Sequence, residues 1–378
     1  MIDPVRQEVI ALAHTIVIKV GTNVLTDARG RLDEGRLYSL ADEVQRVRQT
    51  GRKVLLVSSG AVGAGVGKLG LGRRPSDLRH LQACAAVGQG FLMHAYEQCF
   101  SRYGTHAAQI LLTAGDFDNR SRYLNVRNTI LTLFEWNCIP IINENDTVSV
   151  QEIRFGDNDR LAALVTNLLQ APLLIILTVV DGLYTCDPRN DQRAELIRTV
   201  TRLDANIMNM AGLGKSILGT GGMVSKLRAA RIATAAGESV IVANGVRPGV
   251  IDAIFAAEPE GTLFLPQGNT LAARKRWLGY TALPKGSLHV DAGARTAVVE
   301  HGRSLLAIGI TEVHGSFSKG DVVALCGPDG SEFARGLTNY SAHDLARIRG
   351  LRTEQIAETL GVVPYEEVVH RDNLALLV

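Results

Sequence analysis

A glycine-rich segment that ends on a lysine has residue types suited to binding phosphate. Residues 219–226 read Gly-Thr-Gly-Gly-Met-Val-Ser-Lys, and apolar residues at helical spacing follow over 227–236. Glycines let backbone N–H groups approach an anion closely, and the start of a helix carries partial positive charge. Lys226 adds a mobile cation one turn into that helix. The segment therefore predicts a phosphate site, with an ordinary turn before a helix as the alternative.

A second lysine lies in a similar setting near the start of the chain. Residues 16–23 read Ile-Val-Ile-Lys-Val-Gly-Thr-Asn, so that Lys19 ends an apolar run and Gly21 follows it closely. Two lysines, each beside a glycine turn, indicate phosphoryl transfer, in which cations offset the charge of the transferred group.

Two other glycine motifs do not fit the sites that they imitate. Residues 65–70, Gly-Val-Gly-Lys-Leu-Gly, do not directly follow a predicted strand, and the acidic residue of a dinucleotide site is missing. Gly214-Lys215-Ser216 resembles the end of a P-loop, but Asn209 stands where the first glycine is required. We therefore expect neither a nicotinamide site nor a P-loop.

A dense polar cluster follows the apolar run 138–142. Residues 143–146 read Asn-Glu-Asn-Asp, and burying them at a strand end would be costly without a ligand or partners. The carboxylate of Asp146 suits an ammonium group, and amides such as Asn158 both donate and accept hydrogen bonds. These properties indicate a site for an amino acid.

Two further polar segments accompany this cluster. Residues 156–159, Gly-Asp-Asn-Asp, open a helical pattern, where Asp157 has helix capping as an equally good interpretation. Ser59 lies in Ser-Ser-Gly after another apolar run, without the G-x-S-x-G elbow of a nucleophile. We expect Ser59 to bind substrate and not to attack it.

Apolar runs alternate with helical patterns along the first two thirds of the chain. This alternation predicts an α/β fold with a mostly parallel sheet covered by helices, whose ligands lie beyond the carboxyl ends of the strands. The predicted strands are 15–20, 53–57, 107–112, 138–142, 173–177 and 239–243, and the predicted helices are 34–50, 77–100, 120–136, 157–169 and 222–236.

The pattern changes after Pro266. A linker over 266–280 leads to short alternating strands with glycine turns, so that residues 281–378 form a small, mainly β domain. This domain has 9 Lys and Arg against 12 Asp and Glu, a net charge of −3.

The composition excludes several classes of protein. The 378 residues are 46% hydrophobic and 21% charged, with a net charge of +2 that does not favour nucleic acid or anionic membranes. Five scattered cysteines without a C-x-x-C pair predict neither disulfides nor a zinc site. Without the basic-then-apolar order of a signal peptide, we expect a cytoplasmic protein and no membrane partner.

Taken together, the motifs resemble the glutamate 5-kinases of the amino-acid kinase family over nearly the whole chain. The matching segments are 18–23, 57–61, 142–147, 156–159, 181–185, 187–189, 219–223 and Lys226, and the C-terminal domain looks like a PUA domain. The resemblance implies a catalytic domain over 1–265, a linker over 266–280 and a PUA-like domain over 281–378.

The reaction implied by this resemblance is transfer of the ATP γ-phosphoryl group to the side-chain carboxylate of L-glutamate, in the first step of proline biosynthesis. Lys19 and Lys226 would act on the phosphates, with Asp159 as their counter-charge. Mg²⁺ would bridge the nucleotide phosphates, without a metal site made by the protein alone. The implied substrate-binding residues are Ser59, Asn143, Asp146 and Asn158, and the implied ATP-binding residues are Lys19, Thr178, Val179, Thr220, Gly221, Gly222, Met223, Val224, Ser225 and Lys226.

One residue departs from the pattern, and several alternatives stay open. Many members of the family have aspartate where this chain has Val179. The resemblance also implies feedback inhibition by proline and a homo-oligomer. Another acceptor, such as aspartate, N-acetylglutamate or a nucleoside monophosphate, is the nearer alternative. RNA binding by the PUA-like domain is the more distant one, with Arg347, Arg349 and Arg352 as its basic residues, and the domain's negative charge argues against it.

Overall fold

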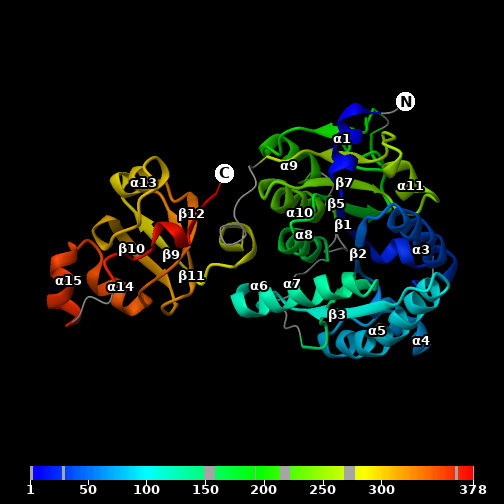
Figure 1. The fold of residues 1–378 in the computed structure, drawn as a ribbon, viewed down its shortest axis with the longest axis horizontal. Helices are drawn as coiled ribbons and strands as arrows, with labels where there is room; N and C mark the ends of the chain where they lie inside the picture. Colours follow the sequence, from blue (N-terminus) through cyan, green and yellow to red (C-terminus); the bar gives the residue numbers. More distant parts are fainter. Residues whose placement is uncertain are drawn as a thin grey trace. The chain divides into compact units, whose positions relative to one another are not determined.

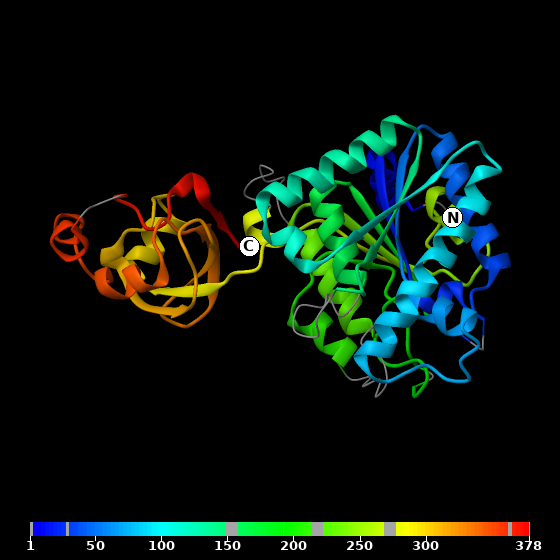
Figure 2. The ribbon, with the colours of Figure 1, turned by 90° about the horizontal axis from the view of Figure 1, so that it is seen from below.

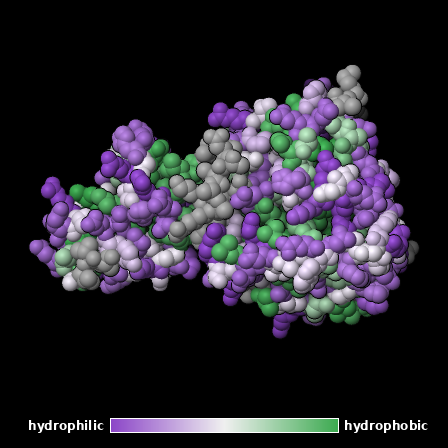
Figure 3. Space-filling view, in the orientation of Figure 1, coloured by the Kyte–Doolittle hydropathy of each residue, from purple (hydrophilic) through white to green (hydrophobic). Residues whose placement is uncertain are grey.

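The computed structural model describes residues 3–27, 30–148, 158–191, 193–212, 222–267, 277–361 and 365–377. The chain divides into two compact units, Met1–Asn269 and Thr270–Val378, and each contains its own sheet (Figure 1). Hydrophilic side chains cover most of the face drawn in Figure 3, with apolar side chains in smaller groups. Among the described residues, no helix has the length and apolar character needed to span a membrane.

The first unit is built on an eight-stranded sheet in the order β3-β4-β2-β1-β5-β7-β8-β6. Neighbouring strands are parallel except for the antiparallel pair β7 and β8, which confirms the predicted mostly parallel sheet. The strands are β1 Thr15–Val20, β2 Lys53–Ser58, β3 Ala107–Leu112, β4 Ile139–Glu144, β5 Leu173–Thr178, β6 Thr199–Val200, β7 Ser239–Asn244 and β8 Thr262–Phe264.

Helices cover both faces of this sheet (Figure 2). The helices α8 and α10 pack on one face, whereas α3, α5 and α11 share a hydrophobic core with the other face. The helices of the unit are α1 Pro4–Leu12, α2 Thr22–Leu25, α3 Glu34–Gln49, α4 Ala61–Lys68, α5 Leu78–Ser101, α6 Ala114–Asp118, α7 Arg120–Glu135, α8 Asn158–Leu169, α9 Ala205–Gly212, α10 Met223–Ala235 and α11 Val250–Phe255.

Strand alternation decides which face each polar side chain occupies. In β1, Ile16 and Ile18 belong to the core shared with α3 and α5, so Lys19 between Ile18 and Val20 points to the face of α8. In β2 and β4 the same core contains Leu56 and Ile141, two residues before Ser58 and Asn143 respectively. Ser58 and Asn143 therefore lie on the face of α5, opposite Lys19.

Two glycines allow α4 and α5 to touch through their backbones. A Cβ on Gly65 would lie 1.8 Å from the Cys84 carbonyl oxygen, and a Cβ on Gly88 would lie 1.9 Å from that of Ala61. The helix α4 begins directly after Gly60, whose φ of 109° is favourable only for glycine. The turn at the end of β2 is thus held against α5 at a fixed distance.

The second unit has a five-stranded sheet in the order β10-β9-β11-β12-β13, in which only β9 and β11 pair in parallel. The mainly β domain is confirmed, and in its described part three α-helices that were not predicted accompany the sheet. Its elements are η1 Trp277–Thr281, β9 Gly286–Val290, α13 Ala292–Val299, η2 Ala307–Gly309, β10 Ile310–Gly315, β11 Val322–Cys326, β12 Glu332–Leu337, α14 Ala342–Ile348, α15 Thr353–Leu360, η3 Arg371–Asn373 and β13 Leu374–Leu376.

Candidate active site

Two lysines share one buried carboxylate at the carboxyl edge of the first sheet. The Nζ atom of Lys19 lies 2.5 Å from Oδ1 of Asp159, and the Nζ atom of Lys226 lies 3.0 Å from Oδ2. The Asp159 side chain is fully buried, and the two lysine side chains are only 6% and 5% exposed. Ser225 donates a hydrogen bond from Oγ to Oδ2 of Asp159 at 2.8 Å.

Lys19, Asp159 and Lys226 form a buried trio in which two ammonium groups share one carboxylate. Ammonium groups donate strong, charge-assisted hydrogen bonds to phosphate oxygens. A phosphoryl group has the charge and the acceptor oxygens to bind beside the two lysines, so the trio is suited to an anion.

Secondary structure brings the trio together from three separate elements. Lys19 is the penultimate residue of β1, Asp159 lies in the first turn of α8, and Lys226 lies in the first turn of α10. The helix α10 has Gly222 as its N-cap without a side-chain hydrogen bond, and a Cβ there would meet open space. Gly222 has no side chain that could cap the N–H groups at the start of α10, and such N–H groups are suited to donate to an anion.

The predicted ATP segment lies only partly within the described residues. Gly222 and the first turn of α10, with Met223, Val224 and Ser225, are described, whereas Thr220 and Gly221 lie outside the described residues. Asp157 and Gly156 of the predicted helix start also lie outside them.

An amide and hydroxyl cluster lies beside the trio, centred on Asn158 at the start of α8. Nδ2 of Asn158 lies 2.9 Å from Oγ of Ser59, 2.9 Å from Oδ1 of Asn143 and 3.1 Å from the carbonyl oxygen of Ser58. Because Asn158 and Asp159 are consecutive, the cluster and the trio are joined through the first turn of α8. Asn158 thus contacts two of the other three predicted substrate-binding residues, Ser59 and Asn143.

The remaining predicted residues follow strand ends nearby in the same sheet. Asp146 is half-buried in the turn after β4, two residues beyond Glu144. Thr178 ends β5, and Val179 after it has a 46% exposed side chain. An exposed valine contributes apolar surface here but no side-chain charge.

The loop after β5 has a hydrogen-bond network of its own. Asp181 accepts a hydrogen bond from Asn244 Nδ2 at 2.9 Å and another from the Tyr184 hydroxyl at 3.0 Å. Asn244 ends β7 directly beside Thr178 of β5. Burial and the Asp181 bond raise the pKa of Tyr184, so the phenol stays protonated and keeps donating.

Two residues of α5 contact the site but were not predicted to do so. The Tyr96 hydroxyl lies 2.8 Å from Oγ of Ser58, and Oε1 of Gln89 accepts a hydrogen bond from Asn143 Nδ2 at 2.9 Å. Burial raises the pKa of Tyr96 far above its usual range, so its hydroxyl remains neutral. Gln89 and Tyr96 are seven residues apart, a spacing that places both on one face of a helix. This spacing was the signal in the sequence that could have indicated a shared contact with the site.

A metal site made by side chains is not found in the described part of the chain. No group of three or more His, Cys, Asp or Glu there could hold an ion. Both carboxylate oxygens of Asp159 already face lysines, which does not suit a cation.

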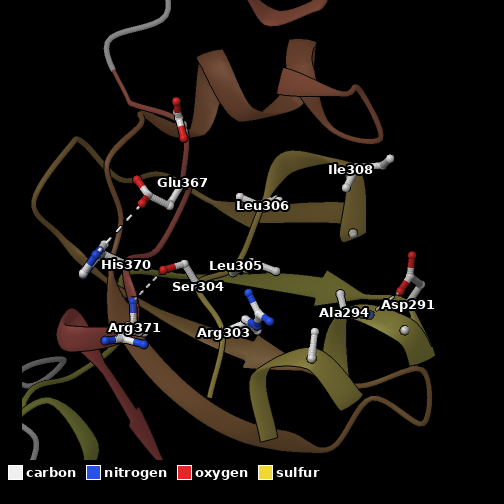
Figure 4. A pocket seen from close by; sticks show the side chains of 14 residues that line it. Asp291, Ala294, Arg303, Ser304, Leu305, Leu306, Ile308, Glu367, His370 and Arg371 are labelled. Carbon is white, nitrogen blue, oxygen red and sulfur yellow. Dashed lines mark hydrogen bonds and ion pairs between the residues drawn. The ribbon is translucent and has the colours of Figure 1, made fainter. Parts of the chain in front are cut away.

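The second unit contains a separate pocket of about 690 Å³ (Figure 4). Its walls come from α13, the segment 303–309 and the segment 366–371. Three basic side chains, Arg303, His370 and Arg371, stand against three acidic ones, Asp291, Glu366 and Glu367. This balance of charge does not favour a polyanion such as RNA in the pocket.

Comparison with known proteins identifies both units. The model of the amino acid kinase family matches residues 14–244, and the PUA domain model matches residues 286–360. The first match covers the strands and helices that carry the trio and the amide cluster.

Similar proteins extend over nearly the whole chain. Glutamate 5-kinase of Moorella thermoacetica is 48% identical over 365 residues, which is 97% of each chain. That of a Synechococcus species is 50% identical over 97% of this chain and 99% of its own, and that of a Geobacter species is 47% identical over 98% and 100%. The chain belongs to the amino acid kinase family and, within it, to the glutamate 5-kinase family.

Proposed function

We propose that this protein transfers the γ-phosphoryl group of ATP to the side-chain carboxylate of L-glutamate, giving glutamyl 5-phosphate and ADP, at the start of proline biosynthesis. The observation that carries the proposal is the buried pair of lysines held by one carboxylate beside a cluster of amides and a hydroxyl. The relatives named glutamate 5-kinase supply the choice of acceptor.

The reaction needs no covalent intermediate on the protein. A glutamate carboxylate is ionised at neutral pH and attacks the γ-phosphorus directly. A new bond forms between carboxylate oxygen and phosphorus, and the bond from that phosphorus to the β,γ-bridging oxygen breaks, so ADP leaves with the electron pair. The protein's contribution is alignment of the two substrates and stabilisation of charge.

In this proposal Lys19 acts on the transferring phosphoryl group and Lys226 on the nucleotide phosphates. Two preorganised cations in a water-poor site stabilise negative charge more strongly than solvent does. Asp159 holds both lysines through its two oxygens, so its role is to fix their separation. The uncapped start of α10, with Gly222, adds backbone donors for the phosphates.

The acceptor is proposed to bind at the ends of β2 and β4. Ser59, Asn143 and Asn158 supply neutral hydrogen-bonding groups, and Asp146 supplies the charge that pairs with the α-amino group. The nucleotide base is proposed to lie near Thr178 and Val179, with Thr220 and Gly221 completing the phosphate segment.

Several finer points are proposals from the family resemblance. Mg²⁺ would be held by the nucleotide phosphates and would add positive charge there. We also propose a catalytic domain over 1–265, a linker over 266–280, a PUA-like domain over 281–378, a cytoplasmic homo-oligomer and feedback inhibition by proline. Addition of proline to the assay below, and sedimentation of the purified chain, test the last two.

The test is ADP release by the full chain with Mg²⁺ and L-glutamate, N-acetylglutamate or L-aspartate in parallel. Hydroxylamine traps an acyl phosphate as a stable hydroxamate, so a hydroxamate formed only with L-glutamate would support the proposal. Lys226→Met should abolish the product, because methionine has nearly the volume of lysine but lacks its positive charge. Turnover of another acceptor alone, or ADP release without hydroxamate, would refute it.

A further inference from the structure

We propose that Gln89 of α5 is a positioning residue for the acceptor, because it fixes the orientation of the Asn143 amide. The inference rests on the proposed function, since it concerns the half of the site that would hold the acceptor carboxylate substrate. It adds to that half a residue that lies more than 50 positions away from Asn143 in the sequence.

The orientation of the Asn143 amide follows from its hydrogen bonds. The backbone N–H of Glu144 donates to Oδ1 of Asn143 at 2.9 Å, and Nδ2 of Asn158 donates to the same oxygen at 2.9 Å. A backbone N–H can only donate a hydrogen bond, so the atom of Asn143 that faces Glu144 must be the acceptor Oδ1. The Nδ2 atom of Asn143 must therefore face α5. There Gln89 presents Oε1 at 2.9 Å.

The Gln89 side chain has no other hydrogen bond within the described part of the chain. Its Nε2 atom is covered and lacks a partner there. A covered amide nitrogen without a partner does not stabilise a fold. The hydrogen bond to Asn143 is therefore the contact that accounts for a glutamine at this position.

The backbone places Gln89 where this contact is possible. Gly88, the preceding residue, lets α5 touch the start of α4, and α4 follows the Ser59 turn directly. The contact between α4 and α5 thus holds Gln89 close to the turn that contains Ser59.

Without the Gln89 acceptor, the buried Nδ2 of Asn143 would have to seek another partner by rotation. Rotation would turn Nδ2 of Asn143 towards Nδ2 of Asn158, and two donors cannot bond to each other. The amides that face the acceptor would then lose their alignment. The hydrogen bond between Gln89 and Asn143 involves no atom of the lysine trio, so nucleotide binding should change little.

The experiment compares Gln89→Met with Gln98→Met in the full chain, using ADP release with both substrates varied. Gln98 is exposed on the same helix and is the matched control. For Gln89→Met we expect KM for L-glutamate to rise about tenfold, as for loss of one buried hydrogen bond. KM for ATP should stay within about twofold, and the melting temperature within about 4 °C of the parent.

A double-mutant cycle separates positioning from simple structural support. If Gln89 acts through Asn143, Gln89→Met should have no further effect on KM for L-glutamate in an Asn143→Ala background. Additive effects in the cycle, an unchanged KM for the acceptor, or equal increases in both KM values would overturn the inference. If the parent chain uses another acceptor, the proposed function fails, and the same cycle with that acceptor still decides the role of Gln89.

Discussion

Replacing Asp159 with asparagine would leave two buried lysines without the carboxylate that they share. Asparagine has the same shape as aspartate but carries no charge, so the change isolates electrostatics from packing. Asp159→Asn should therefore reduce both the stability of the first unit and its proposed kinase activity.

The size of the effect follows from the contacts of the trio. The lysine Nζ atoms lie 2.5 and 3.0 Å from different oxygens of Asp159, so they are at most about 8 Å apart. At an effective dielectric constant near 20, two like charges at that distance repel by about 2 kcal/mol or more. Breaking a buried ion pair by removing one partner costs about 3–5 kcal/mol in all. The melting temperature should fall by roughly 10 °C.

Nucleotide binding should restore much of the stability that Asp159→Asn loses. The phosphates of ADP bring the negative charge that the variant lacks, so ADP should raise the melting temperature of Asp159→Asn by more than that of the parent. The kcat should fall about 10²- to 10³-fold, because the lysines no longer hold a fixed separation.

Thermal unfolding with and without ADP, together with kcat from ADP release, measures both effects. The control is Asp252→Asn, which removes an exposed carboxylate whose side chain lies 2.6 Å from Arg46. An exposed pair of this kind contributes about 0–1 kcal/mol. If Asp159→Asn unfolds at the same temperature as Asp252→Asn, or gains no more from ADP than the parent, the electrostatic reasoning is wrong.

Three further changes test other parts of the molecule. Asp146→Asn should raise KM for L-glutamate about 10- to 100-fold, because a charge-assisted hydrogen bond to the α-amino group is lost. KM for glutarate, which lacks the amine, should stay unchanged. Equal increases in both KM values would contradict the amine contact. Gly88→Ala should destabilise the fold in denaturant, because its Cβ would lie 1.9 Å from a carbonyl oxygen, whereas Gly90→Ala, with open space at the Cβ, should stabilise it by up to about 1 kcal/mol. Burial raises the pKa of Glu43 above that of an exposed glutamate, so the stability that Glu43 contributes is present below the unfolded-state pKa and is lost as pH rises through the folded-state pKa. Melting temperatures from pH 4 to 7 should decline less steeply for Glu43→Gln, and an unchanged slope would exclude Glu43 as a cause.

The sheet was predictable because its buried strands are continuous apolar runs. Prediction was weakest where polar residues continue a strand: the predicted strands ended at Val57 and Ile142, whereas β2 and β4 extend to Ser58 and Glu144. Strands β6 and β8 have only two and three residues, too few for a pattern to appear. The helix α4 was missed because three glycines hide its helical pattern.

Single residues of the site were predictable from the sequence, whereas the contacts that α5 makes with them were not. Glycine turns, lysines and polar strand ends indicated a phosphate and amino-acid site, and the structure brings Lys19, Asp159 and Lys226 into contact. Their catalytic roles stay predictions. Gln89 and Tyr96 could not be assigned, because their contacts depend on how α5 packs against the sheet, which local sequence does not encode.

The alternation of β1, β2 and β4 has a consequence for how such an enzyme can change over generations. Lys19 is held by Asp159 of α8, whereas Ser58 and Asn143 are hydrogen-bonded both to Asn158 of α8 and to side chains of α5 on the other side of the sheet. Substitutions behind α5 can therefore remodel the choice of acceptor while the layer behind the lysines, and with it the handling of phosphate, stays intact. Related enzymes could thus change their acceptor through substitutions in α5 while they keep the residues that hold the two lysines.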